Sequence, residues 1–448
     1  MKTVPAGPFA LGLILSLALP AARAQSDGRA GVQTAAGSEI AGGARGDTLE
    51  FMLTPDDSTR APGGNPQEEV RFSDQDDWLR APFGDNLLTD VDEWRSGGNR
   101  LTRTSPLVDY NRVDRLRLGV GHQLQSHRPM LPRLGARLEY AFGRKRVLYG
   151  VQFEQPLLPP GRLAVGVSMV RRTDHSELQQ VEDVENSLAL LFGRQDYRDY
   201  FEREGYGAYV SWRVPDFSTV SAHLRSDDYR ALGLNRGTRS FFHRSRNLRD
   251  NPRADEGTAR TATLRLERLA HRTHRTRAGF YHWIDLERAG HGLGGDFEYT
   301  RLLADLRSVV RLSPAVTLSG RFVGGCTLDG TLPFQKQFTV GGVDGLRAHE
   351  FAKYRGDQML LSQVEYTVGL WHVRSGIFEG GLHAIAFADV GRAWSNADHH
   401  WDVGRQQIQT DGGVGLSTSE DNLRIYFARN LRVPDSDFVV SVRLQRPF

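Results

Sequence analysis

The chain has 448 residues, of which 39% are apolar and 25% charged, and its 57 basic and 54 acidic residues give a net charge of +3. This composition excludes a bundle of membrane helices, because each helical span needs about 20 consecutive apolar residues, and the small charge excess indicates no nucleic-acid partner. The 48 glycines favour strands and turns over helices, and the single cysteine, Cys326, excludes an internal disulfide and a cysteine-based metal cluster.

The first predicted element is a secretory signal peptide over residues 1–24. Lys2 precedes a short apolar stretch, residues 10–19, and Ala22-Arg23-Ala24 has the form of a signal-peptidase site. The apolar stretch is shorter than a membrane span, so we expect cleavage after Ala24 and export of the rest of the chain.

Residues 25–104 are rich in glycine, aspartate, arginine, serine and proline and have no sustained apolar period. This composition predicts a flexible or poorly structured periplasmic segment, because such a segment buries too little apolar surface to offset the entropy of ordering.

Residues 105–448 alternate between apolar and polar side chains. In the last run, Phe438, Val440 and Val442 share one face, whereas Ser441 and Arg443 lie on the other. Both a soluble sandwich and a transmembrane barrel produce this pattern, but sandwich strands average about 5–6 residues whereas tilted membrane strands need about 9–11. Many of the runs reach the longer length, and charged side chains can face a hydrated lumen. The fold class is therefore all-β, a transmembrane antiparallel β-barrel.

Fifteen alternating segments can be counted, from residues 112–124 to residues 438–448. Bacterial single-chain barrels have an even number of strands, so we expect a sixteenth just before Tyr110. Short turns alternate with long segments at about 174–203, 229–257 and 328–357, which are predicted external loops. Within the first of these, residues 184–200 have some helical character.

Two motifs in residues 338–394 go beyond the general barrel pattern. Residues 338–347 read FTVGGVDGLR, and residues 386–394 read AFADVGRAW. This pair resembles the BamA/TamA superfamily of outer-membrane β-barrels, of the bacterial surface antigen type, which includes the two-partner-secretion transporters. The resemblance implies a long loop folded inward, and the count of sixteen strands places this loop before the twelfth strand.

The charged residues of these motifs are expected to meet inside the barrel. Phe387, Asp389 and Gly391 are spaced two residues apart and therefore share the lumen face. A carboxylate there needs a cation, which Arg347 on the preceding loop can supply. In the superfamily the corresponding arginine and aspartate are thought to lock the loop to the wall. The intervening strand contributes Glu365 to the motif.

The glycines of the loop are expected to permit its bends, since glycine tolerates backbone conformations closed to other residues. They are Gly341, Gly342 and Gly345. Two features depart from the superfamily pattern. The loop tip reads Leu346-Arg347-Ala348-His349 instead of Val-Arg-Gly followed by an aromatic residue, and residues 25–104 have room for at most one polypeptide-transport domain and lack its alternation of helices and strands.

The resemblance implies a part in the insertion or translocation of proteins at the outer membrane. The alternative is a channel or structural barrel that passes small solutes. We expect no enzymatic activity, cofactor or metal, because no G-x-S-x-G motif or other catalytic set is visible. Expected partners are outer-membrane lipids, the barrel assembly machinery that inserts this chain, and a client polypeptide.

The final residue, Phe448, is predicted to belong to the signal by which the assembly machinery recognises the barrel, because it ends an alternating strand. Deleting Phe448 should lower the level of the protein in the outer membrane, measured as heat-modifiable, membrane-inserted protein. An unchanged level would contradict the prediction.

Overall fold

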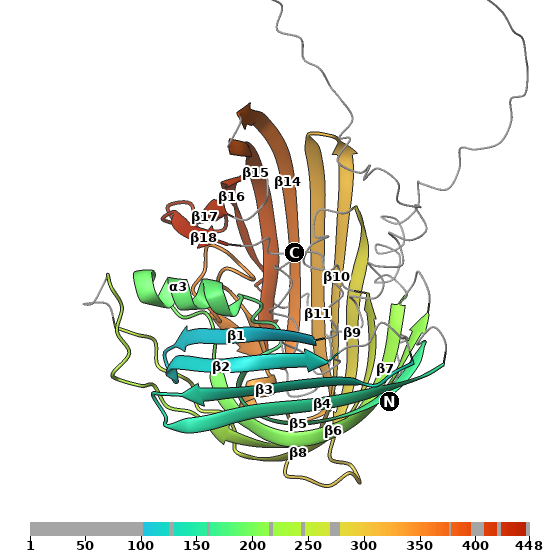
Figure 1. The fold of residues 1–448 in the computed structure, drawn as a ribbon. Coiled ribbons are helices and arrows are strands. Elements are labelled where there is room, and N and C mark those ends of the chain that lie inside the picture. Colours follow the sequence, from blue (N-terminus) through green and yellow to red (C-terminus); the bar gives the residue numbers. More distant parts are fainter. Residues whose placement is uncertain are drawn as a thin grey trace, which may run out of the picture. The chain divides into compact units, whose positions relative to one another are not determined.

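The computed structural model describes residues 102–124, 130–158, 162–214, 218–242, 247–268, 278–375, 378–395, 407–418 and 423–444. The predicted signal peptide, residues 25–101 of the predicted N-terminal segment, and Phe448 lie outside them. Within them, sixteen strands form one antiparallel sheet in which strands adjacent in the chain are adjacent in space (Figure 1). No helix in the described part of the chain is long and apolar enough to cross a membrane.

The strands of this sheet have the following bounds: β1 Thr102–Asn111, β2 Arg115–Leu124, β3 Arg133–Ala141, β4 Arg146–Leu158, β5 Leu163–His175, β6 Tyr200–Val214, β7 Ser218–Ala231, β8 Gly257–Arg268, β9 Gly279–Ala289, β10 Tyr299–Ser313, β11 Val316–Gly330, β14 Gln358–Ser375, β15 Phe378–Trp394, β16 Gln409–Thr418, β17 Arg424–Asn430 and β18 Val439–Arg443. The segment between β11 and β14 contains a 3-10 helix, η4 (Phe334–Lys336), and two short strands, β12 (Phe338–Val340) and β13 (Tyr354–Gly356), which pair with each other.

The predicted fold class and strand number are confirmed. The expected sixteenth strand is β1, which pairs with β2 over its whole length. It contains Pro106, whose missing N–H group restricts proline to edge strands. β14 is the twelfth strand of the sheet, so the long loop lies where it was expected.

Alternation places charges inside and apolar side chains outside. On β3, Leu134, Leu138 and Tyr140 are exposed, whereas Arg137 and Glu139 are buried and joined by a hydrogen bond from Arg137 Nε to Glu139 Oε1 of 2.6 Å. An outward apolar face suits the hydrocarbon of a bilayer, and paired charges suit a polar interior.

One helix, α3 (Asp183–Gly193), lies in the segment between β5 and β6. The sequence indicated helical character over residues 184–200, but the helix ends seven residues earlier. Arg194 adopts a left-handed conformation, with φ of 54°; its N–H donates to the Leu190 carbonyl group and the Gln195 N–H donates to the Ala189 carbonyl group. This left-handed cap ends the helix.

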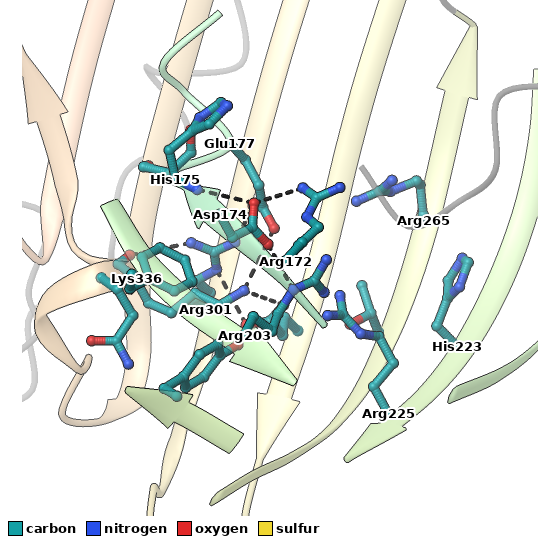
Figure 2. Close-up of a pocket in the computed structure, with 16 residues that line it drawn as sticks. Arg172, Asp174, His175, Glu177, Arg203, His223, Arg225, Arg265, Arg301 and Lys336 are labelled. Carbon is teal, nitrogen blue, oxygen red and sulfur yellow. Dashed lines mark hydrogen bonds and ion pairs between the residues drawn. The ribbon is translucent and has the colours of Figure 1, made fainter. Parts of the chain in front are cut away.

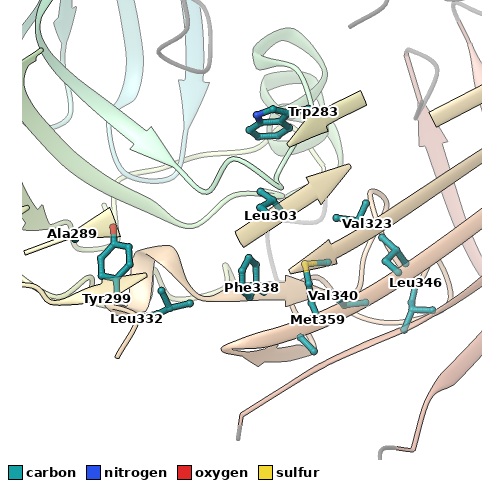
Figure 3. Packing of buried hydrophobic residues seen from close by; sticks show 12 residues of the cluster. Trp283, Ala289, Tyr299, Leu303, Val323, Leu332, Phe338, Val340, Leu346 and Met359 are labelled. Carbon is teal, nitrogen blue, oxygen red and sulfur yellow. The ribbon is translucent and has the colours of Figure 1, made fainter. Parts of the chain in front are cut away.

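Apolar side chains of the long loop pack against the inner wall of the sheet (Figure 3). Phe338 is fully buried, and a Cβ atom added to Gly325 of β11 would lie 2.6 Å from its ring, so the wall has a glycine where the ring approaches. The loop is therefore held by burial as well as by charge. The cluster consists of Trp283, Ala289, Tyr299, Leu303, Val323, Leu332, Phe338, Val340, Leu346, Met359, Leu361 and Ala393.

Candidate functional site

The loop between β11 and β14, residues 331–357, makes a tight double bend at its tip. Gly341 and Gly342 have φ of 127° and 87°, in the region that favours glycine. Gly345 does not have a positive φ; instead, a Cβ atom there would lie 2.9 Å from the Gly341 nitrogen. Two of the three predicted glycines thus permit bends, and the third permits close approach of the backbone.

Arg347, at the loop tip, contacts two carboxylates of the barrel wall. Its Nη1 atom donates to Glu365 Oε1 of β14 at 2.6 Å, and its Nη2 atom donates to Asp389 Oδ1 of β15 at 3.0 Å. The three side chains are at most 1% exposed. Buried charges at this spacing form strong charge-assisted hydrogen bonds. The structure therefore brings together the predicted residues Arg347, Glu365 and Asp389.

Two aromatic rings enclose the guanidinium group of Arg347. Its Cζ atom lies 4.1 Å from the ring centre of Phe387 and 4.6 Å from that of Tyr426 on β17. The two rings meet edge to face. Opposite Phe387 in β16 lies Gly413, where a Cβ atom would come within 2.9 Å of the Phe387 ring. Cation–π attraction adds to the ion pairs in this water-poor site.

A side chain of β14 binds the backbone of the loop tip and fixes its position. Gln363 of β14 donates from Nε2 to the Gly345 carbonyl at 2.9 Å and to Asp389 Oδ1 at 3.3 Å. Gly391, the last residue of the predicted F-x-D-x-G strand motif, lies so close to β14 that a Cβ atom would be 2.6 Å from the Leu360 carbonyl oxygen. The site thus depends on close packing between β14 and β15.

Besides Gln363, sequence reasoning missed Asp411, Arg424 and Tyr426 as residues of the site. Asp411 of β16 accepts the Ala348 N–H at 2.7 Å and lies 3.1 Å from His349 Nδ1. Arg424 and Tyr426 of β17 both donate to the Glu365 carboxylate, at 2.9 Å each. Their lumen-facing position was visible in the alternation, but their distance from the loop tip depends on strand register.

A second contact ties the loop to the last strand. Arg443 of β18 donates from Nη1 to Asp344 Oδ1 at 2.9 Å and to the Val343 carbonyl at 3.0 Å. Its Nε atom donates to Glu185 of α3 at 2.6 Å. One buried arginine therefore joins β18, the loop and α3.

Comparisons with known proteins agree with this geometry. The Omp85 superfamily domain matches residues 132–428, about two thirds of the chain. The chain belongs to the Omp85 superfamily. The resemblance predicted from the two motifs is confirmed, and membership places the protein in the outer membrane.

Two relatives illustrate how far the likeness extends. The outer membrane protein assembly factor BamA of Nitratidesulfovibrio vulgaris strain Hildenborough is 23% identical over 340 residues, which cover 69% of this chain and 41% of that protein. The chain thus spans about two fifths of the length of this relative. The crystal structure of BamA from Haemophilus ducreyi lacking POTRA domains 1–3 has a TM-score of 0.51 at 12% identity, covering 77% of this chain and 70% of that one. This similarity shows the shared fold.

The lumen of this Omp85 barrel also contains a small polar cavity of about 40 Å³, room for a few water molecules (Figure 2). Basic side chains surround acidic ones there, and Glu177 lies among them. It receives a hydrogen bond from Arg301 and lies 3.5 Å from the Nζ atom of Lys336 in η4. The cavity lining includes Arg172, Arg203, Arg225, Arg265, Arg301 and Lys336 against Asp174, Glu177 and Glu287.

These contacts shift the pKa values of Glu177, in the β5–β6 segment, and of Lys336, in the long loop. Burial alone would raise the pKa of the Glu177 carboxyl group, but Lys336 and Arg301 bring it well below its usual value. Burial alone would lower the pKa of Lys336, but Glu177 and Glu287 raise it above its usual value. Both groups are therefore charged at neutral pH, and they connect the β5–β6 segment with the long loop.

Replacing Glu177 should weaken this connection in a pH-dependent way. Because the folded-state pKa of Glu177 lies below its usual value of 4.5, its contribution to stability is present above that pH and is lost as the pH falls towards the folded-state pKa. Glu177→Gln should cost about 1.5–3 kcal/mol at pH 7 and reduce the loss of stability on acidification. Urea unfolding in detergent at several pH values measures both. Parallel pH curves for the two proteins would contradict the prediction.

Proposed function

We propose that this Omp85 protein acts, without enzymatic chemistry, in the insertion of proteins into the outer membrane or in their translocation across it. The observation that carries the proposal is that the two edge strands of the sheet, β1 and β18, do not pair with each other in the described residues. In the described residues, β1 pairs with β2 and β18 pairs with β17, and no ladder joins β1 to β18. β18 is also short, with five residues.

Unpaired strand edges carry free N–H and C=O groups, which are costly inside a bilayer. An incoming strand of a client polypeptide can pair with such an edge and satisfy these groups. Meanwhile the contacts of Arg347 hold the loop against β14 and β15. The proposed partners are therefore a client polypeptide and outer-membrane lipids, with the cell's barrel assembly machinery needed for the protein's own insertion. One similar protein is an outer membrane protein assembly factor, which supports the same role.

Site-specific photo-crosslinking in cells tests the proposal. A photoreactive amino acid at Leu107 of β1 or Val440 of β18 should form adducts with other outer-membrane proteins during their synthesis. The matched control is Leu264 of β8, which is exposed on the barrel exterior and lies in the middle of the strand order. Depletion of the protein should also lower the level of the crosslinked partners.

The channel alternative makes the opposite prediction. A large steady conductance in planar bilayers, with no adducts at Leu107 or Val440 and no change in other outer-membrane proteins after depletion, would overturn the proposal. The described loop residues that pack into the lumen, such as Phe338 and Leu346, are expected to limit steady conductance.

A further inference from the structure

The helix α3 presents two different faces. Its inner face is polar and buried, and it contacts both edges of the sheet. Ser187 receives a hydrogen bond from the Tyr110 N–H of β1 at 2.8 Å and donates one to Asp109 at 3.1 Å. Glu185 pairs with Arg443 of β18 at 2.6 Å. In Figure 1, α3 accordingly lies between β1 and the pair of strands β17 and β18.

The outer face of α3 is apolar and exposed. Val184, Leu188 and Phe192 follow one another at intervals of four residues, and they are 61%, 36% and 48% exposed. Phe241 and Phe242, from the segment after β7, extend this stripe, since their ring centres lie 5.6 and 6.1 Å from that of Phe192. We call these five residues the seam patch.

The position of the seam patch indicates what covers it. The strands that the inner face of α3 contacts have exposed apolar residues on their outer surface, Val108 on β1 and Val440 and Val442 on β18. That surface faces lipid in an outer-membrane barrel. The seam patch therefore continues the lipid-facing surface across the gap between the first and last strands, where no strand pairing is present in the described residues.

Two exposed arginines lie in the segment that leads to Phe241 and Phe242. Arg239 is held next to α3, because its N–H donates to the Tyr110 hydroxyl group and its carbonyl accepts from it, at 2.9 and 2.8 Å. Arg236 lies three residues earlier and is also exposed. Within the described part of the chain, neither arginine pairs with a carboxylate. Aromatic and aliphatic residues bordered by basic residues are typical of a membrane interface with anionic head groups.

We propose that the seam patch binds a membrane lipid, with the acyl chains against Val184, Leu188 and Phe192 and a phosphorylated head group at Arg236 and Arg239. A lipid fits better than a client polypeptide because the apolar stripe adjoins the lipid-facing wall and the positive charge of Arg239, two residues before Phe241, lies at its border. The bound lipid covers the side of α3 that the protein itself leaves exposed. This inference does not depend on the transport role.

Fluorescence quenching in vesicles tests the proposal. In a Cys326→Ser background, Val184→Cys or Leu188→Cys carries an environment-sensitive dye, and the full protein is reconstituted into phosphatidylcholine vesicles with brominated acyl chains. Glu350→Cys, at a loop side chain that is 87% exposed, is the matched control. Heat-modifiable migration verifies that each variant is folded. We expect loss of fluorescence and a blue shift at positions 184 and 188 but not at position 350.

The head group is tested by adding phosphatidic acid to the vesicles. The quenching at positions 184 and 188 should increase with phosphatidic acid, and Arg236→Gln combined with Arg239→Gln should abolish the increase. Dye that stays in water in every vesicle would overturn the proposal. Equal quenching with and without phosphatidic acid would overturn the head-group site. Shielding that occurs only when an unfolded outer-membrane protein is added would instead assign the patch to a polypeptide.

Discussion

Arg347→Ala should release the inward loop while leaving the barrel folded. The substitution leaves two buried carboxylates, and Asp389 loses the cation that it contacts in the described part of the chain. Glu365 keeps Arg424 at 2.9 Å. Breaking a buried ion pair from one side costs about 3–5 kcal/mol. The rest of the wall keeps its ladders between β14, β15 and β16.

The loss should therefore be local and visible in hydrogen exchange of residues 341–354. The Ala348 N–H, which donates to Asp411, should exchange at least about a hundred times faster, the equivalent of about 3 kcal/mol. Protease cleavage within the loop should rise in parallel. Lys353→Ala on the same loop is the control, because Lys353 is 53% exposed and its nearest carboxylate oxygen lies 3.9 Å away.

Comparison of single and double variants shows whether Arg347 and Asp389 act through their shared contact or independently of each other. Asp389→Ala should have a smaller effect than Arg347→Ala, because Arg347 then keeps Glu365 at 2.6 Å. The double variant should be no worse than Arg347→Ala, since the shared contact is already lost. Full additivity of the two single effects, or no change in loop exchange for Arg347→Ala, would contradict the lock.

The sequence predicted which side chains of this site face the lumen. It did not predict all of the residues that meet there. Alternation is a local property, so Phe387 and Asp389 could be assigned to the interior from β15 alone. The partners Asp411 and Tyr426 come from two further strands, and their distance from the loop tip depends on the register of β15 with β16 and of β16 with β17. Register is set by the turns and the whole sheet, which no single segment encodes.

The place of α3 illustrates the same limit. Helical character in the β5–β6 segment was visible, but its position at the edge of the sheet follows from contacts such as Glu185 with Arg443, which lie 258 residues apart. The alternating pattern of β18 assigned Arg443 to the interior. It could not show that this arginine connects the helix, the loop and the last strand.

Arg443→Ala should therefore loosen β18 more than the replacement of any apolar side chain of this strand by alanine. The substitution removes the hydrogen bonds to Asp344, the Val343 carbonyl and Glu185 in one step. Burial raises the pKa of Glu185 above its usual value even though Arg443 opposes this shift, so Glu185 can take up a proton when Arg443 is lost. We expect Arg443→Ala to lower the stability of the folded protein by about 3 kcal/mol, the lower end of the range for removing one partner of a buried ion pair.

The affected groups are the amides of β18 and the contact between α3 and the edge. Val439–Arg443 should exchange amide hydrogens faster, and heat-modifiable migration should change at a lower temperature. Glu185→Gln should be milder, because its side-chain carbonyl still accepts a hydrogen bond from Arg443 Nε and Arg443 keeps Asp344. Arg432→Ala, at an exposed position between β17 and β18, serves as the matched control. If Arg443→Ala and Arg432→Ala leave β18 equally protected, Arg443 does not hold the last strand to the loop and the helix.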